Sequence, residues 1–127
     1  MKKSAFTILS VSFILFFGCN FGNLSQEIKI KNSTASNVII ESCDKETSET
    51  SWPVELLPDN EKSFKIEGLH ESVDFKIKYK NQNYTLDTEY IHDNTKITIK
   101  LTEDNSELKA SKTVGGKTKE AHLVLEN

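Results

Sequence analysis

The sequence predicts an all-β domain, a small antiparallel β-sandwich similar in size to immunoglobulin or transthyretin domains. Apolar and polar residues alternate with a period of two, which is typical of strands with one buried face. No segment after the N-terminal region has the period of an amphipathic helix, and clusters of Asn, Asp, Gly, Ser and Pro recur at short intervals. We expect eight or nine short strands, at 27–31, 38–40, 52–57, 62–67, 72–80, 84–90, 96–102, 108–114 and 117–126.

The alternation is clearest in the segment 72–80. Val73, Phe75 and Ile77 would face the core, and the charged residues between them would face solvent. The run 38–40 is β-branched or aliphatic throughout, which indicates a strand that is buried on both faces or bulged.

Proline and glycine fix the expected edges and turns. Pro53 lies in the expected strand 52–57, and because proline cannot donate to a ladder, this strand should lie at an edge. Pro58 suits the second position of a type I turn. Gly115 and Gly116 suit a two-residue primed turn, so the tail should form a last hairpin.

The N-terminal residues 1–18 have the pattern of an export leader. Lys2 and Lys3 precede an uncharged run at 5–17. This run is shorter than the ~20 apolar residues that a membrane-spanning helix needs. It is followed by Gly18 and Cys19.

A small residue before a cysteine, directly after an apolar run, resembles the end of a bacterial lipoprotein signal peptide. The resemblance implies cleavage after Gly18 and a diacylglycerol on the sulfur of Cys19, with fatty chains such as palmitate. Phe16 and Phe17 stand where the usual motif has leucine and a small residue. A plain secretory leader with an incidental cysteine is the alternative.

The resemblance also implies a location and a domain plan. The mature chain would be extracytoplasmic and held in a bacterial membrane by acyl chains on Cys19. Asn20, rather than aspartate, favours the outer membrane. We expect a lipidated cysteine and short tether at 19–26, followed by one β-sandwich domain at 27–127.

Composition argues against nucleic acid as a partner. Removal of residues 1–18 takes away two lysines, so the formal charge changes from −3 to −5. All 16 basic residues are lysine, and arginine is the side chain best suited to bidentate recognition of phosphates and base edges. We expect contact with a membrane through the acyl chains and an unidentified protein partner.

The sequence does not predict an enzyme, a metal site or a cofactor. His70, His92 and His122 are far apart, and none belongs to a zinc-binding or catalytic motif. The sequence 115–118 resembles the end of a phosphate-binding loop, but it lacks the first glycine and the helix that must follow.

Two features are candidates for binding. The lysines at outward strand positions would form one cationic face if their strands were neighbours, and this face would suit anionic headgroups or a polyanionic glycan. The alternative is that they maintain solubility and protect strand edges. They are Lys29, Lys31, Lys76, Lys78, Lys80, Lys96 and Lys100. We select Lys76, Lys78 and Lys80 as binding candidates.

The other candidate is Trp52, which follows the polar loop 42–51. Aromatic residues beside such loops are frequent binding hot spots, although packing under the loop is the simpler explanation. Cys43 would have no intramolecular partner if Cys19 carried lipid, and we expect it to be an inert residue at a strand end rather than a reactive thiol.

These observations favour a non-catalytic binding module of a bacterial envelope, acting in surface recognition. The alternative is an accessory or inhibitor subunit of an envelope assembly.

Overall fold

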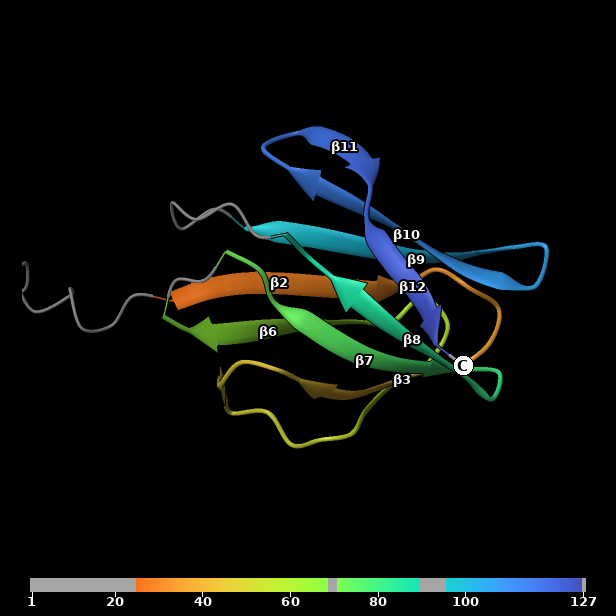
Figure 1. The fold of residues 1–127 in the computed structure, drawn as a ribbon, viewed down its shortest axis with the longest axis horizontal. Coiled ribbons are helices and arrows are strands. Elements are labelled where there is room, and N and C mark those ends of the chain that lie inside the picture. Colours follow the sequence, from red (N-terminus) through yellow and green to blue (C-terminus); the bar gives the residue numbers. More distant parts are fainter. Residues whose placement is uncertain (1–24, 69–70, 90–95, 127) are drawn as a thin grey trace, which may run out of the picture.

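The computed structural model describes residues 25–68, 71–89 and 96–126, and these residues confirm the predicted β-sandwich (Figure 1). Two sheets pack against each other. Strand order in the six-stranded sheet is β11 (Lys117–Glu120), β10 (Glu107–Val114), β9 (Ile97–Asp104), β2 (Ser25–Asn32), β6 (Glu61–Glu67) and β4 (Thr47–Ser48). Strand order in the five-stranded sheet is β12 (His122–Glu126), β8 (Gln82–Asp87), β7 (Asp74–Tyr79), β3 (Val38–Cys43) and β5 (Val54–Leu56).

The alternation in sequence becomes the core between the sheets. Ile28 and Phe64 lie opposite each other on β2 and β6, and both are fully buried. Phe75 reaches Phe64 from the other sheet, with ring centroids 5.2 Å apart. Each strand therefore contributes every second residue to one shared apolar interior.

Two details of the edges and bulges follow the prediction. The register of β3 against β7 shifts between Ile40 and Ser42, so the strand that contains the run 38–40 is bulged, which was one of the two expectations for it. Strand β5, directly after Pro53, lies at the edge of its sheet, as expected.

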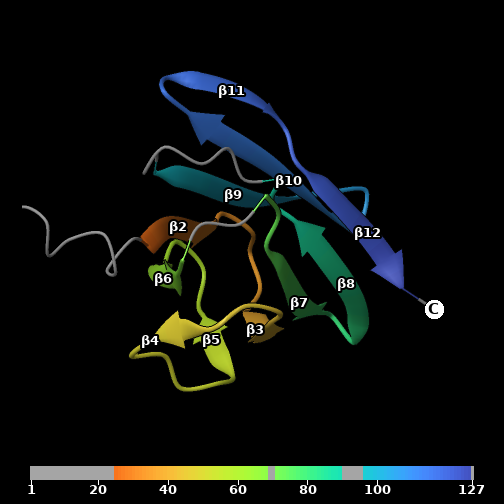
Figure 2. The ribbon, with the colours of Figure 1, turned by 60° about the vertical axis from the view of Figure 1, so that its left-hand side comes forward.

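The structure corrects the boundaries of two segments. Strand β2 begins at Ser25, and Gln26 is buried, so two residues assigned to the tether belong to the domain. The second arm of the predicted last hairpin divides at Ala121. Its first part, β11, pairs with β10, and its second part, β12, pairs with β8 in the other sheet (Figure 2).

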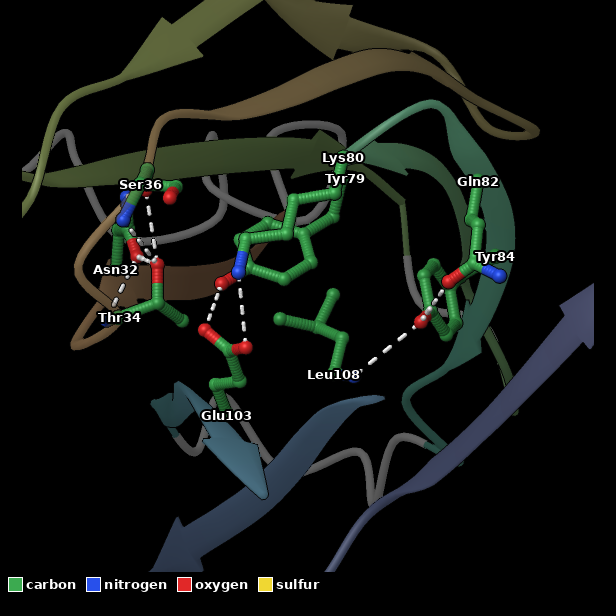
Figure 3. Close-up of polar contacts among 9 residues, drawn as sticks. All are labelled: Asn32, Thr34, Ser36, Tyr79, Lys80, Gln82, Tyr84, Glu103 and Leu108. Atoms are coloured by element: carbon green, nitrogen blue, oxygen red, sulfur yellow. Dashed lines mark hydrogen bonds and ion pairs between the residues drawn. The ribbon is translucent and has the colours of Figure 1, made fainter. Parts of the chain in front are cut away.

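One end of the sandwich is held by hydrogen bonds, and we call it the turn end. It carries the turns 33–36, 57–60, 80–81 and 105–106. The Tyr79 hydroxyl donates to the Glu103 carboxylate of the other sheet, and the Leu108 N–H donates to the Tyr84 hydroxyl at 3.2 Å (Figure 3). The two sheets are thus joined by polar contacts as well as by the core.

Buried Asn32 completes the turn end. Its side-chain amide donates to the carbonyl of Ser36 at 2.8 Å (Figure 3). The same amide donates to the carbonyl of Leu56 at 2.9 Å. Its side-chain oxygen accepts hydrogen bonds from the backbone N–H and the hydroxyl of Thr34. The Asp59 N–H also donates to the backbone carbonyl of Asn32, so the side chain and the backbone of this one residue together hold the turns 33–36 and 57–60.

Candidate functional site

The structure divides the predicted lysine face between the two sheets. Lys76 and Lys78 lie on β7 in the five-stranded sheet, whereas the lysines of β2 and β9 lie in the six-stranded sheet. Their outward faces are on opposite sides of the sandwich. The condition for one shared cationic face is therefore not met, because β2 and β9 are neighbours but β7 is in the other sheet.

Two of the three selected lysines are in ion pairs. The Lys76 ammonium lies 3.2 Å from the Glu126 carboxylate, and the Lys80 ammonium lies 2.9 Å from that of Glu103. Lys80 also lies over the Tyr79 ring. Their charges are thus largely matched by local partners.

Trp52 and Cys43 are both partly buried and pack against the hydrophobic core. The Trp52 ring stacks on Phe64, with centroids 5.5 Å apart and planes within 3°. Cys43 ends β3 and is half-buried, and this burial raises the pKa of its thiol. Trp52 therefore packs against the core, and Cys43 is less readily ionised than an exposed cysteine.

A different group of lysines lines a cavity of about 360 Å³ on the β10–β11 hairpin. We call it the lysine pocket. Its lining residues are Lys112, Val114, Lys117, Thr118 and Lys119.

The hairpin turn determines which residues meet in the pocket. Gly115 and Gly116 both have positive φ, 58° and 82°, as the predicted primed turn requires. The register that follows places Lys112 opposite Lys119 and Val114 opposite Lys117. All three ammonium groups therefore come from the same face of one hairpin.

Lys112 is the fixed member of the pocket. The residue is only 2% exposed, and its ammonium donates to the backbone carbonyls of Thr88 and Glu89 at 2.9 and 3.3 Å. The Glu89 carboxylate is 4.0 Å away. Burial lowers the pKa of Lys112, and the positive charge of Lys119 lowers it further.

The other two lysines have unmatched charges. Within the described part of the chain, neither Lys117 nor Lys119 forms an ion pair, although six other lysines lie within 4.0 Å of an exposed or partly exposed carboxylate. The pocket thus combines one buried cation with two exposed ones. This arrangement suits a negatively charged group, which would reduce the repulsion between the lysines.

None of these three lysines was among the binding candidates predicted from the sequence. The predicted Gly115–Gly116 turn already implied their register, so the juxtaposition was within reach of the sequence. The burial of Lys112 against the carbonyls of Thr88 and Glu89 depends on a distant segment, and it is not a local feature.

Among the described residues, those that line the pocket include none of the other residues that the sequence singled out. Cys19, His70 and His92 lie outside the described residues, and His122 is exposed on β12. Among the residues that the structure describes, no group of three or more His, Cys, Asp or Glu side chains is arranged to hold a metal ion. The same part of the chain contains no helix long and apolar enough to cross a bilayer.

Comparison of the chain with models of known protein families and with curated proteins gives no match. The lysine pocket is therefore interpreted from its own geometry and charge.

Proposed function

We propose that the chain is a lipid-anchored, non-catalytic binding module of a bacterial envelope, and that it recognises an acidic ligand in the lysine pocket. The observation that carries the proposal is the convergence of Lys112, Lys117 and Lys119 on one cavity. Ammonium groups are strong partners for carboxylate and phosphate oxygens.

The size of the cavity indicates the class of ligand. About 360 Å³ is near the lower limit for small-molecule pockets. Val114 and the carbon stems of the lysines add apolar surface beside the charges. A sugar-sized acid, with a carboxylate or phosphate on a carbon body, matches this combination.

The position of the pocket agrees with an anchored domain. Strand β9 runs parallel to β2, and β10 returns antiparallel, so the hairpin tip lies at the end where β2 begins (Figure 1). If Cys19 carries lipid, the pocket is on the membrane-facing side. A ligand from the membrane surface or from the adjacent cell wall would reach it directly.

The ligand proposal is tested by calorimetric titration of the chain with glucuronate, glucose 6-phosphate and neutral glucose at low salt. We expect binding of one or both acids but not of glucose, and a loss of about tenfold or more in affinity in a Lys117→Gln/Lys119→Gln variant. Lys76→Gln/Lys100→Gln is the matched control, because it removes the same charge elsewhere. If the two double substitutions weakened binding equally, the effect would be a general one of charge, and this result would contradict binding in the lysine pocket.

The anchor proposal is tested separately by metabolic labelling with a radioactive fatty acid. The wild-type chain should be labelled, and Cys19→Ala should lose the label. The described domain begins at Ser25, after Cys19, so the variant should still be folded. Label that persists in Cys19→Ala would place the lipid elsewhere or exclude this type of anchor.

An accessory or inhibitor subunit of an envelope assembly is the second candidate. It is favoured by the two apolar side chains exposed on β12, Val124 and Leu125. Protease treatment of intact cells separates the two functions, because a displayed recognition module is degraded and an inward-facing subunit is protected.

A further inference from the structure

The described residues form two sheets with four edges, and β12 differs from the other three edge strands. Strands β4 and β5 have only two and three residues. Strand β11 has the sequence Lys-Thr-Lys-Glu, and such charges on an edge oppose pairing with another chain. The five residues of β12, His-Leu-Val-Leu-Glu, include no proline and have an apolar centre.

Strand β12 is also where apolar surface is concentrated. Three large hydrophobic residues are exposed in the described part of the chain, and two of them, Val124 at 49% and Leu125 at 38%, are neighbours on β12. A crevice of about 140 Å³ lies on the inner side of the strand, next to Leu123 and Leu125. An unprotected edge with exposed apolar side chains is typical of a strand-pairing surface.

The hydrogen bonds of β10 and β12 indicate which backbone edge in this region could pair with a further strand. The neighbouring part of β10 has its Leu108 N–H bonded to the Tyr84 hydroxyl and its Ala110 carbonyl bonded to the Ala121 N–H. In contrast, β12 is hydrogen-bonded to β8 on one side only and is the last strand of its sheet. A further strand would therefore pair along the edge of β12 that faces away from β8.

We propose that β12 pairs with β12 of a second copy of this chain, antiparallel, with the twofold axis at Val124. In this register Val124 lies opposite itself, and Leu123 lies opposite Leu125 of the second copy. His122 then lies opposite Glu126, which places a basic ring beside an acid at both ends of the pair. The two five-stranded sheets join into one continuous sheet of 5 + 5 strands.

The sequence of β12 is the reason for choosing a second copy as the partner. Its five residues match themselves when reversed, apolar with apolar and histidine with glutamate. An isologous pair requires this property, because each contact is made twice. The paired leucines would also lie beside the crevice, which Leu123 and Leu125 help to line.

The register is tested by disulfide cross-linking of the full chain, purified in mild detergent, with Cys43→Ser as the background. Val124→Cys should give a cross-linked dimer, because opposite residues in an antiparallel pair are about 4.5–5.5 Å apart at Cα, within the range of a disulfide. The matched control is Thr85→Cys, on the neighbouring strand β8, where the distance across the axis is far too large. Equal cross-linking at both positions, or none at Val124, would overturn the proposed register.

Sedimentation velocity of the same full chain tests the surface without relying on cysteine chemistry. Val124→Lys should weaken the dimer about tenfold or more, and its circular dichroism should be unchanged because the side chain is exposed. His122→Glu should weaken the dimer, and the double change His122→Glu/Glu126→His should restore it.

A chain that is monomeric up to about 1 mM, or a dimer insensitive to these changes, would overturn the proposal. Protection of β12 amides only when a different envelope protein is added would assign the edge to that partner and would also overturn self-pairing.

Discussion

The two ends of the sandwich differ in whether their polar groups have partners within the described domain. At the turn end, buried donors and acceptors meet one another, as in the Asn32 cluster and the cross-sheet bonds of Tyr79 and Tyr84 (Figure 3). At the opposite end, which we call the pocket end, Lys117 and Lys119 have no carboxylate partner among the described residues. The difference indicates that the turn end stabilises the fold and the pocket end is available for a ligand.

Titrating groups at both ends have shifted pKa values. At the turn end, hydrogen bonds from Tyr79 and Lys80 lower the pKa of Glu103, whereas burial raises the pKa of Tyr79. At the pocket end, burial raises the pKa of Asp74, and the nearby charges of Asp87 and Asp44 raise it further. The direction of each shift follows the group's own neighbours, so the two ends are distinguished by their hydrogen bonds and by the lysines without carboxylate partners.

The largest effect should come from breaking the turn end at Asn32. Asn32→Ala removes two donors and an acceptor from a buried cluster, which leaves the Leu56 carbonyl and the Thr34 N–H without their partner. We expect a loss of about 2–4 kcal/mol in the free energy of unfolding, measured with urea. Asn37→Ala is the control, because the bond from Asn37 to Glu55 is exposed, and it should change stability by less than about 0.5 kcal/mol.

A smaller effect should follow from removing one bond between the sheets. Tyr84→Phe keeps the buried ring but leaves the Leu108 N–H without an acceptor. The expected loss is about 1–3 kcal/mol in the same urea assay. If stability were unchanged, the hydroxyl would not be joining the sheets, and the turn end would be held by packing alone.

At the pocket end, removing a charge should stabilise the fold. The folded state lowers the pKa of Lys112, so the protonated amine costs stability at neutral pH, and that cost fades as the pH rises through the lowered value. Lys112→Met should gain up to about 1 kcal/mol at pH 7, because the lost bonds to two carbonyls offset part of the gain, and should bind acids more weakly. The gain should shrink as the pH approaches 10, measured by urea unfolding at several pH values. A loss of stability at pH 7 would mean that the carbonyl contacts outweigh the burial of the charge.

The smallest effect is expected at Asp74. Its pKa is raised in the folded state, so the ionised carboxylate costs stability at neutral pH, and the cost disappears as the pH falls towards the ordinary value of 3.8. Asp74→Asn should raise the free energy of unfolding by less than about 1 kcal/mol at pH 7 and by nothing at pH 3. A gain that does not depend on pH would come from the amide's hydrogen bonds rather than from the lost charge.

Local patterns in the sequence were enough to predict the strands and several turns. Alternation identified Phe75 and Ile77 as core residues, and the paired glycines Gly115 and Gly116 identified the hairpin and its register. These features depend on neighbours along the chain, which a single sequence contains.

The strand order was not predicted, because it depends on contacts between distant segments. Strand β2 lies between β6 and β9, and the sequence does not reveal this order. It also does not reveal that the final arm changes sheets at Ala121. The sequence therefore left open whether the lysines of β2 and β7 share a face, and it did not show that Lys112 of the last hairpin is buried against the carbonyls of Thr88 and Glu89.

The central position of β2 has a mechanical consequence. Its first residue, Ser25, receives any pull from the preceding segment, and the pull acts along the strand. This direction of pull loads the seven residue pairs with β6 and the five with β9 in shear. These pairs therefore resist the load together instead of separating one after another. A force applied through the preceding segment would therefore act on β2, a strand that is paired on both sides.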